Sequence, residues 1–162
     1  MERKSILMVG IIIVLFVVVA FVGFGQFGGT SPFSSQSTVK VGDVYFDMPQ
    51  GFHEESSDGS SVKLNDGSHS IFIKQFNDSN INKHIDEYLK YANGKNVSVT
   101  RSNTTFGDFD IQKAVGNETG ATYYWYNYNN KTYQLNTWGN YDKTESTFIG
   151  LMESMSTTDK TK

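Results

Sequence analysis

Two short groups of acidic and histidine residues are the candidates for metal binding or acid–base chemistry. His53, Glu54 and Glu55 are consecutive and offer nitrogen and oxygen ligands of the kind that divalent metals take in proteins. Asp108 and Asp110 are two residues apart, a spacing that on a strand places both carboxylates on one side for calcium binding or acid–base work. The alternative for the first group is a solvated acidic loop, and the alternative for the second is that Asp108 belongs to a turn. No pair of histidines has the spacing typical of metal sites, so the sequence predicts no metal centre and no cofactor.

Nucleophilic catalysis has weaker candidates. Ser68, His69 and Ser70 are adjacent, but neighbouring side chains on a strand point to opposite faces and cannot share a proton. The chain has no glycine-flanked serine of the hydrolase type and no glycine-rich phosphate loop. The sequence therefore predicts no catalytic residue. An enzyme remains the alternative, a hydrolase-like cell-surface protein with a composite site formed by Asp108, Asp110 and His53.

Aromatic and amide residues are densest in two segments that a short turn can join into a β-hairpin. A two-residue turn at Asn129–Asn130, or at Asn130–Lys131, would place Tyr124, Tyr126, Tyr128, Tyr133 and Leu135 on one face, which we interpret as core. The opposite face would collect six residues, and we refer to it as the predicted ligand face: Tyr123, Trp125, Asn127, Gln134, Asn136 and Trp138.

The predicted ligand face suits a binding function. Flat rings beside amide side chains can stack on sugars or hold an extended peptide. The alternative is that the C-terminal helix covers this face, in which case the rings are its packing partners. A three-residue turn would move Tyr133 and Leu135 to the other face and break the grouping.

Asparagine followed by any residue and then Ser or Thr occurs more often than composition alone predicts. Such segments are candidate N-glycosylation sites, and most of them fall at element ends and turns, where a glycan can be accommodated. Chance occurrence in a chain rich in Asn, Ser and Thr is the alternative. The candidate acceptors are Asn77, Asn96, Asn103, Asn117 and Asn130.

Hydrophobic periodicity predicts the elements that carry these residues. Alternation of apolar and polar residues, bounded by turn residues, predicts about seven strands; they fall near residues 44–48, 61–64, 70–76, 97–100, 109–115, 121–128 and 132–139. A helix is predicted over 80–93, with its apolar stripe at every third or fourth residue and Gly94 as its stop. A final helix, capped by Asp142 or Thr144, carries an apolar stripe that includes Phe148 and Leu151.

The resulting order, βββαββββα, favours an α+β domain. Single strands do not alternate with helices, which disfavours a parallel doubly wound sheet. We therefore expect an antiparallel sheet of about seven strands packed by two helices. Aromatic residues make up 14% of the chain and cysteine is absent, so the core must stabilise the domain without disulfides.

Two segments of the domain resemble PsbP-like domains. The sequence FDMPQGF before a hairpin is similar to the first strands of that family, and FIGLMESM after a tryptophan-containing strand is similar to its closing helix. The resemblance spans Val41 to Ser156. It implies a compact α/β/α sandwich and a role as a binding or assembly module, with no catalytic motif. The whole chain also resembles uncharacterised small membrane-anchored archaeal proteins.

The N-terminal segment predicts a membrane anchor. Ile6–Phe24 contains no charged residue, and at about 1.5 Å per residue it forms a helix roughly 28 Å long, close to the thickness of a bilayer core. Arg3 and Lys4 precede it and no charge follows until Lys40, which predicts a cytoplasmic N-terminus and a single-pass protein. Cleavage after Gly25 as a signal peptide is the alternative.

These segments divide the chain into an anchor at 1–24, a Gly/Ser-rich linker at 25–38, an extracytoplasmic domain at 39–156 and a disordered tail at 157–162. The formal net charge of −3 disfavours nucleic acid as a partner. We therefore expect a membrane-tethered extracytoplasmic binding or interaction module, with an envelope polysaccharide or a protein as its partner.

Overall fold

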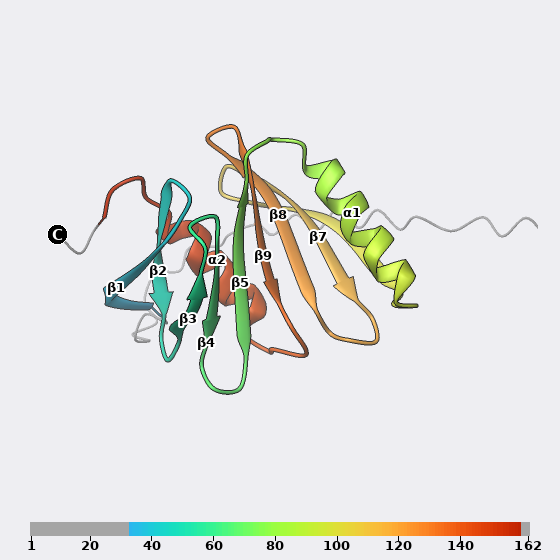
Figure 1. Ribbon diagram of the computed structural model, residues 1–162, viewed down its shortest axis with the longest axis horizontal. Helices are drawn as coiled ribbons and strands as arrows, with labels where there is room; N and C mark the ends of the chain where they lie inside the picture. The colour runs from blue at the N-terminus through green and yellow to red at the C-terminus, as the bar shows by residue number, and fades with distance from the viewer. Residues whose placement is uncertain (1–32, 160–162) are drawn as a thin grey trace, which may run out of the picture.

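The main sheet of the computed structural model has seven antiparallel strands in the order β3-β4-β5-β9-β8-β7-β6 (Figure 1). The structure describes residues 33–159. The strands of this sheet are β3 (His53–Ser57), β4 (Ser61–Asn65), β5 (Ser70–Phe76), β6 (Val99–Phe106), β7 (Phe109–Gly116), β8 (Thr122–Tyr128) and β9 (Lys131–Thr137). Neighbouring strands in this sheet are also consecutive in sequence, with one exception. The exception is the pair of β5 and β9, which brings the two halves of the described chain together at the centre of the sheet.

A separate two-stranded ribbon is formed by β1 (Phe33–Val41) and β2 (Val44–Pro49). The other edge of β2 is bonded to the segment after the last helix, since the Tyr45 N–H donates to the Ser156 carbonyl at 2.7 Å and the Ser156 N–H donates back at 3.0 Å. The ribbon and the C-terminal end of the described chain therefore form one structural unit beside the main sheet.

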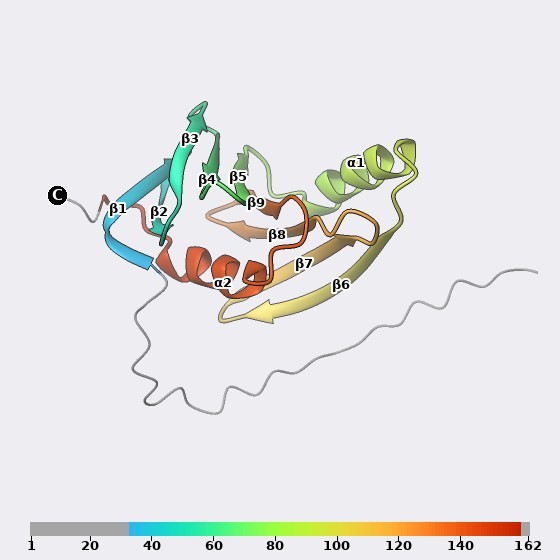
Figure 2. The same ribbon diagram turned by 90° about the horizontal axis from the view of Figure 1, so that it is seen from below.

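The two helices lie on opposite faces of the main sheet. Figure 2 shows α1 (Ile81–Gly94) above the half of the sheet that contains β7 and β8, and α2 (Thr144–Ser154) below it, next to β1 and β2. On the α2 side the core contains Phe148, Leu151 and Met152 together with ribbon residues such as Phe46. The predicted α+β class, with an antiparallel sheet and two helices, is confirmed.

The ends of α1 follow local hydrogen-bonding rules. Asn80 caps the N-terminus, because its side-chain oxygen accepts from the Lys83 N–H at 3.2 Å. At the other end Gly94 is still helical, and the left-handed residue that ends the helix is Asn96, with φ 56°. The predicted stop is therefore two residues early.

The start of α2 differs from the prediction. Lys143 occupies the cap position and no side chain caps the helix, so neither Asp142 nor Thr144 is the cap. The Thr144 hydroxyl instead donates to the Tyr141 carbonyl at 2.6 Å. This bond holds the preceding turn against the first turn of the helix.

Two strands were not predicted, so the observed order is βββββαββββα. The edge strand β3 has only exposed side chains and is held by pairing with β4, so it leaves no apolar signal. Strand β1 begins at Phe33, inside the segment predicted as linker, because β2 supplies hydrogen-bond partners to residues with little strand propensity of their own.

The structure describes only part of the two ends of the chain, so the predictions made for them can be compared with it only in part. The predicted span Ile6–Phe24 lies outside the described residues, and neither of the helices within 33–159 has the length and apolar character needed to cross a membrane. At the other end, Asp159 accepts a hydrogen bond from the Thr38 hydroxyl at 3.4 Å, so part of the predicted tail contacts β1.

Candidate functional site

The β8–β9 hairpin divides its residues between two faces as predicted. Asn129 and Asn130 have φ values of 49° and 59°, which identifies a two-residue turn with both central residues left-handed. The register pairs Tyr124 with Leu135 and Trp125 with Gln134. The residues of the predicted ligand face therefore lie together on the side of the sheet that carries α1.

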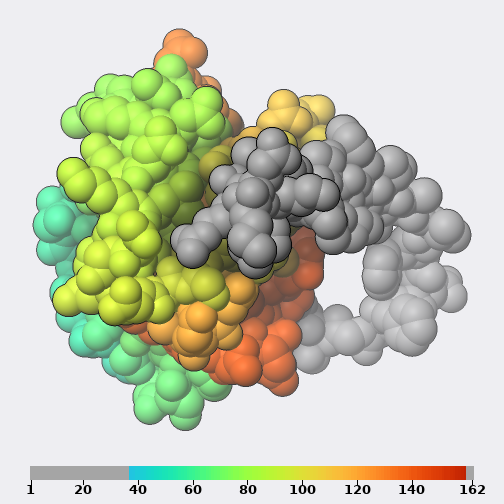
Figure 3. Space-filling view, turned by 90° about the vertical axis from the view of Figure 1, so that its right-hand side faces the viewer, coloured from blue at the N-terminus to red at the C-terminus, as the bar shows by residue number. Residues whose placement is uncertain are grey.

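Helix α1 covers half of the predicted ligand face. Trp125 has no exposed surface and Tyr123 is 8% exposed. The Tyr88 ring of α1 lies 4.1 Å from the Tyr123 ring and 5.5 Å from the Trp125 ring, measured between centroids. In this conformation neither ring can stack on a ligand. The sequence-based alternative, that a helix covers this face, therefore applies to these two rings, but the helix is α1 and not the C-terminal helix. Figure 3 shows α1 as a yellow-green layer on this side of the molecule.

Burial also sets the protonation of the phenols under α1. It raises the pKa of Tyr123 to about 12, with smaller contributions from Tyr88 and Tyr91. Burial also raises the pKa of Tyr88, with a smaller contribution from Tyr91. Both phenols are therefore neutral at any physiological pH, which is expected of packing groups in an apolar layer.

Asn127 has a structural role at the far end of the face. Its side-chain NH₂ donates to the Ser79 carbonyl at 3.0 Å, and its oxygen accepts from the Thr132 hydroxyl at 2.9 Å. Both ends of the amide are thus occupied in fixing the loop between β5 and α1 to the hairpin. Each end of the amide keeps a second hydrogen-bonding position, so this structural role does not by itself exclude contact with a ligand.

The other half of the predicted ligand face is open. Trp138, directly after β9, is 53% exposed, and its ring lies 6.3 Å from the Phe72 ring in an edge-on arrangement. Cross-strand pairing places Lys74 opposite Gln134 and Phe72 opposite Asn136 on this face. We call these five residues the Trp138 surface: Phe72, Lys74, Gln134, Asn136 and Trp138.

Hydrogen bonds connect the covered half to the open half. The Trp125 indole N–H donates to Gln134 Oε1 at 3.0 Å, and Gln134 Nε2 donates to Asn136 Oδ1 at 2.8 Å. Asn136 is only 4% exposed, so it supports the surface more than it presents a group to a ligand. The chain of amides fixes the orientation of Gln134 beside the exposed ring of Trp138.

The candidates for an acid–base site are not brought together. His53 is on β3 at one edge of the sheet, whereas Asp108 is in the β6–β7 turn and Asp110 is on β7 near the other edge. Strands β3 and β7 are separated by four other strands in the sheet order, which corresponds to roughly 24 Å at about 4.8 Å per spacing. A composite site of these three residues therefore does not form within the sheet.

Several other acidic and histidine residues are engaged in local structure. Glu55 pairs with Lys63 at 2.7 Å, and His69 Nδ1 lies 3.1 Å from Asp66 Oδ2 within one turn. His84 is buried under a stacked Phe76 ring, with centroids 3.7 Å apart. Within residues 33–159, no three His, Asp or Glu side chains are arranged to hold a metal ion.

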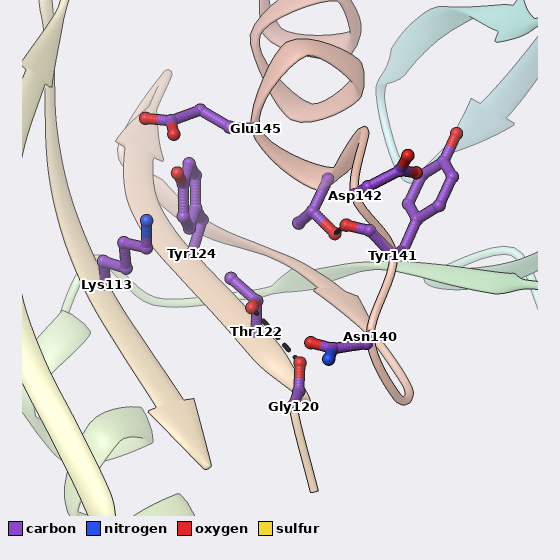
Figure 4. A pocket seen from close by; sticks show the side chains of 9 residues that line it. Lys113, Gly120, Thr122, Tyr124, Asn140, Tyr141, Asp142 and Glu145 are labelled. Carbon is purple, nitrogen blue, oxygen red and sulfur yellow. Dashed lines mark hydrogen bonds between the residues drawn. The ribbon is translucent and has the colours of Figure 1, made fainter. Parts of the chain in front are cut away.

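A pocket of about 190 Å³ lies on the opposite face of the sheet, where β7 and β8 meet the start of α2 (Figure 4). Its wall includes Lys113, Thr122, Tyr124, Asn140 and Glu145. These residues were not among the predicted site residues, because they come from separate elements and match no motif. One signal was available, since Lys113 interrupts an otherwise apolar face of β7 between Ile111 and Val115.

All five candidate glycosylation residues have exposed side chains, on a turn, a strand or a loop. Asn96 and Asn130 have left-handed backbones. Asn117 accepts from the Thr100 hydroxyl at 2.8 Å and donates to Ser98 Oγ at 3.1 Å. Asn77 and Asn103 make up the rest of the set. Whether any of them carries a glycan stays a prediction.

Comparison with known proteins identifies no family. No protein-family model matches the chain, and no curated protein is similar to it. Among solved structures, a crystal structure of a protein from Bacteroides thetaiotaomicron is similar over 78% of this chain and 50% of that chain, with 11% sequence identity and a TM-score of 0.49. The chain thus spans about half the length of that protein, and a likeness of this degree supports no inference about activity.

Proposed function

We propose that this protein is a membrane-tethered extracytoplasmic binding module whose ligand is an envelope polysaccharide. The observation that carries this proposal is the exposed ring of Trp138, with Phe72 beside it and an oriented amide at Gln134. A flat ring next to hydrogen-bonding amides is suited to stacking on a sugar ring. The enzyme alternative has no comparable support, because His53 on β3 lies far across the sheet from Asp108 in the β6–β7 turn and Asp110 on β7.

Charge suggests which polysaccharides to test first. Lys74 lies on the Trp138 surface. The nearby Lys63 ammonium group, 5.8 Å from the Phe72 ring centroid, is already paired with Glu55 at 2.7 Å, so Lys74 supplies the positive charge. Cations at the rim of a binding surface steer anionic ligands towards it. An acidic polysaccharide is therefore the preferred ligand class, and an acidic protein partner is the outcome that would replace it.

Fluorescence quenching of the full chain in detergent micelles tests the proposal. The chain has two tryptophans, and of these Trp138 is exposed and Trp125 is buried. The acidic polysaccharide fraction of the native envelope should protect Trp138 from quenching by acrylamide, and neutral dextran should not. Trp138→Ala removes the fluorescent reporter as well, so its binding is measured by co-sedimentation with the polysaccharide, and it should be abolished. The matched control is Tyr91→Ala, which removes an equally exposed ring from α1 (55%). Unchanged binding by Trp138→Ala would refute the proposal.

The tether and its orientation rest on Ile6–Phe24 and the charges that precede it. Protease added to intact cells should remove the C-terminal domain if it is extracytoplasmic. Digestion only after lysis would place the domain inside the cell and would exclude an envelope ligand. Finding a mature chain that begins at Gln26 would show that the segment is a cleaved signal peptide.

A PsbP-like sandwich is part of the same proposal. The positions of α1 and α2 on opposite faces of the sheet support it. The resemblance implies a binding or assembly role. Crosslinking the full chain in the native envelope would show whether a protein partner accompanies the polysaccharide.

A further inference from the structure

The pocket beside Tyr124 is separate from the Trp138 surface, since Tyr124 and Lys113 are on the face of the sheet that carries α2. We propose that this pocket binds a small zwitterion of the free α-amino-acid type. The ligand carboxylate would pair with Lys113 and its ammonium group with Glu145.

Two opposite charges face the pocket without being paired to each other. The Lys113 ammonium group lies 5.4 Å from the Tyr124 ring centroid, and in Figure 4 the Glu145 carboxylate lies beyond the hydroxyl end of the same ring. Within the described part of the chain, neither Lys113 nor Glu145 forms an ion pair with another residue. A ligand that carries both charges is complementary to this arrangement, whereas a simple anion or cation would meet one like charge.

The Tyr124 hydroxyl gives the second, independent indication of a ligand. Tyr124 is 1% exposed, and its hydroxyl has no hydrogen-bond partner among the described residues. A buried hydroxyl without a partner is unfavourable, because it has lost water and gained no bond in exchange. Burial and the nearby Glu145 carboxylate raise the pKa of Tyr124. The phenol therefore remains a donor and can bond a carboxylate held by Lys113.

The size and floor of the pocket limit the ligand to a small molecule. Pockets for drug-sized ligands hold roughly 300–1,000 Å³, and this one holds about 190 Å³. Its floor is closed where Gly120 meets the loop of Asn140. A Cβ on Gly120 would lie 2.9 Å from Asn140 Oδ1, and Gly120 has φ +67°, so only glycine allows this approach. Asn140 presents its amide to the pocket here, and the Thr122 hydroxyl donates to the Gly120 carbonyl at 3.4 Å. The side chains of Tyr141 and Asp142 are turned away from Tyr124 (Figure 4).

Calorimetric titration of the full chain in detergent micelles tests the proposal. The probes are the twenty common L-amino acids, added singly at millimolar concentration, and the N-acetyl and carboxamide derivatives of whichever binds best. At least one amino acid should bind, and both derivatives should bind roughly tenfold or more weakly, because each has lost one charge. Heat from none of the amino acids, or equal binding of either derivative, would overturn the proposal.

Variants locate the binding. Lys113→Met keeps the aliphatic stem and should weaken binding roughly tenfold or more. The matched control is Lys90→Met on α1, on the opposite face of the sheet, which should bind as the wild type does. Tyr124→Phe removes only the unpartnered hydroxyl, so it should weaken binding several-fold while leaving the melting temperature unchanged or higher. If Lys113→Met folds poorly, the affinity of Tyr124→Phe tests the site instead. Wild-type affinity in Tyr124→Phe would refute the proposed role of the hydroxyl and, with it, the site.

Discussion

Trp125 and Gln134 lie directly opposite each other on β8 and β9, and the indole N–H of the first donates to Oε1 of the second at 3.0 Å. Trp125 is fully buried under α1, while Gln134 is partly exposed beside Trp138. The bond therefore joins the helix-covered half of the predicted ligand face to its open half. It satisfies a buried donor and at the same time fixes the group that a ligand would meet.

This difference in burial predicts opposite behaviour of the two tryptophans in stability measurements. Trp125→Phe removes buried volume and the partner of Gln134, so it should lower the free energy of unfolding by about 2 kcal/mol. Trp138→Phe changes an exposed ring and should stay within about 0.5 kcal/mol of wild type. Urea denaturation of the full chain in detergent, followed by near-UV circular dichroism, measures both. Similar losses in the two variants would contradict the assignment of Trp125 to the core.

The strength of local hydrophobic patterns decided which elements could be predicted. The α1 stripe was evident because Ile85 and Ala92 lie on one helical face, and both are buried. The β8–β9 register was predictable because Asn129 and Asn130 tolerate left-handed backbones. Strand β3, with its exposed side chains, left no pattern to read, since its position depends on pairing with β4.

The candidate site was only half predictable for a related reason. Alternation along a strand shows which residues share a face, and this grouped Trp125 with Trp138. It does not show which part of the face a helix will cover, because α1 precedes the hairpin in sequence and reaches it only through tertiary packing. The pocket was beyond prediction because Lys113, Tyr124 and Glu145 meet only after β7, β8 and α2 have packed.

Gly42, in the turn of the β1–β2 ribbon, should tolerate substitution poorly. It has φ +60°, and a Cβ there would overlap the side-chain amide of Gln75. Gln75 is buried, donates to the Tyr133 hydroxyl and accepts from Lys131 at 3.3 Å. Gly42→Ala should therefore combine backbone strain with loss of this buried network and cost about 3 kcal/mol.

The control for that variant is Gly51→Ala. Gly51 also has a left-handed backbone, with φ +86°, but nothing lies within 4 Å of its Cβ position. Gly51→Ala should lower the free energy of unfolding by about 1 kcal/mol, through backbone strain alone. Urea midpoints of the two variants give the difference directly. Equal midpoints would mean that the ribbon moves aside and that Gln75 is not held as described.

The candidate glycosylation residues should differ in occupancy. Asn103 is exposed on the edge strand β6, and no hydrogen bond from its side chain is seen. At Asn117, a glycan would compete with the bond from the amide nitrogen to Ser98 Oγ. We therefore expect higher occupancy at Asn103 than at Asn117. Mass spectrometry of peptides from the native membrane measures both, with Asn103→Gln as the control for assignment. Higher occupancy at Asn117 would contradict this order, and an absence of glycans would remove this support for an extracytoplasmic location.

Alkaline pH should destabilise the domain through Tyr123. Burial raises its pKa to about 12, above the ordinary value of 10.0. A group whose pKa is raised on folding contributes stability that is fully present below the unfolded value and is lost as the pH rises through the folded value. The free energy of unfolding should therefore fall between pH 10 and about 12. Urea midpoints across this range should fall less steeply in Tyr123→Phe, which lacks this phenol and keeps only that of Tyr88 at the same contact. Equal slopes in wild type and variant would show that α1 does not exclude water from Tyr123.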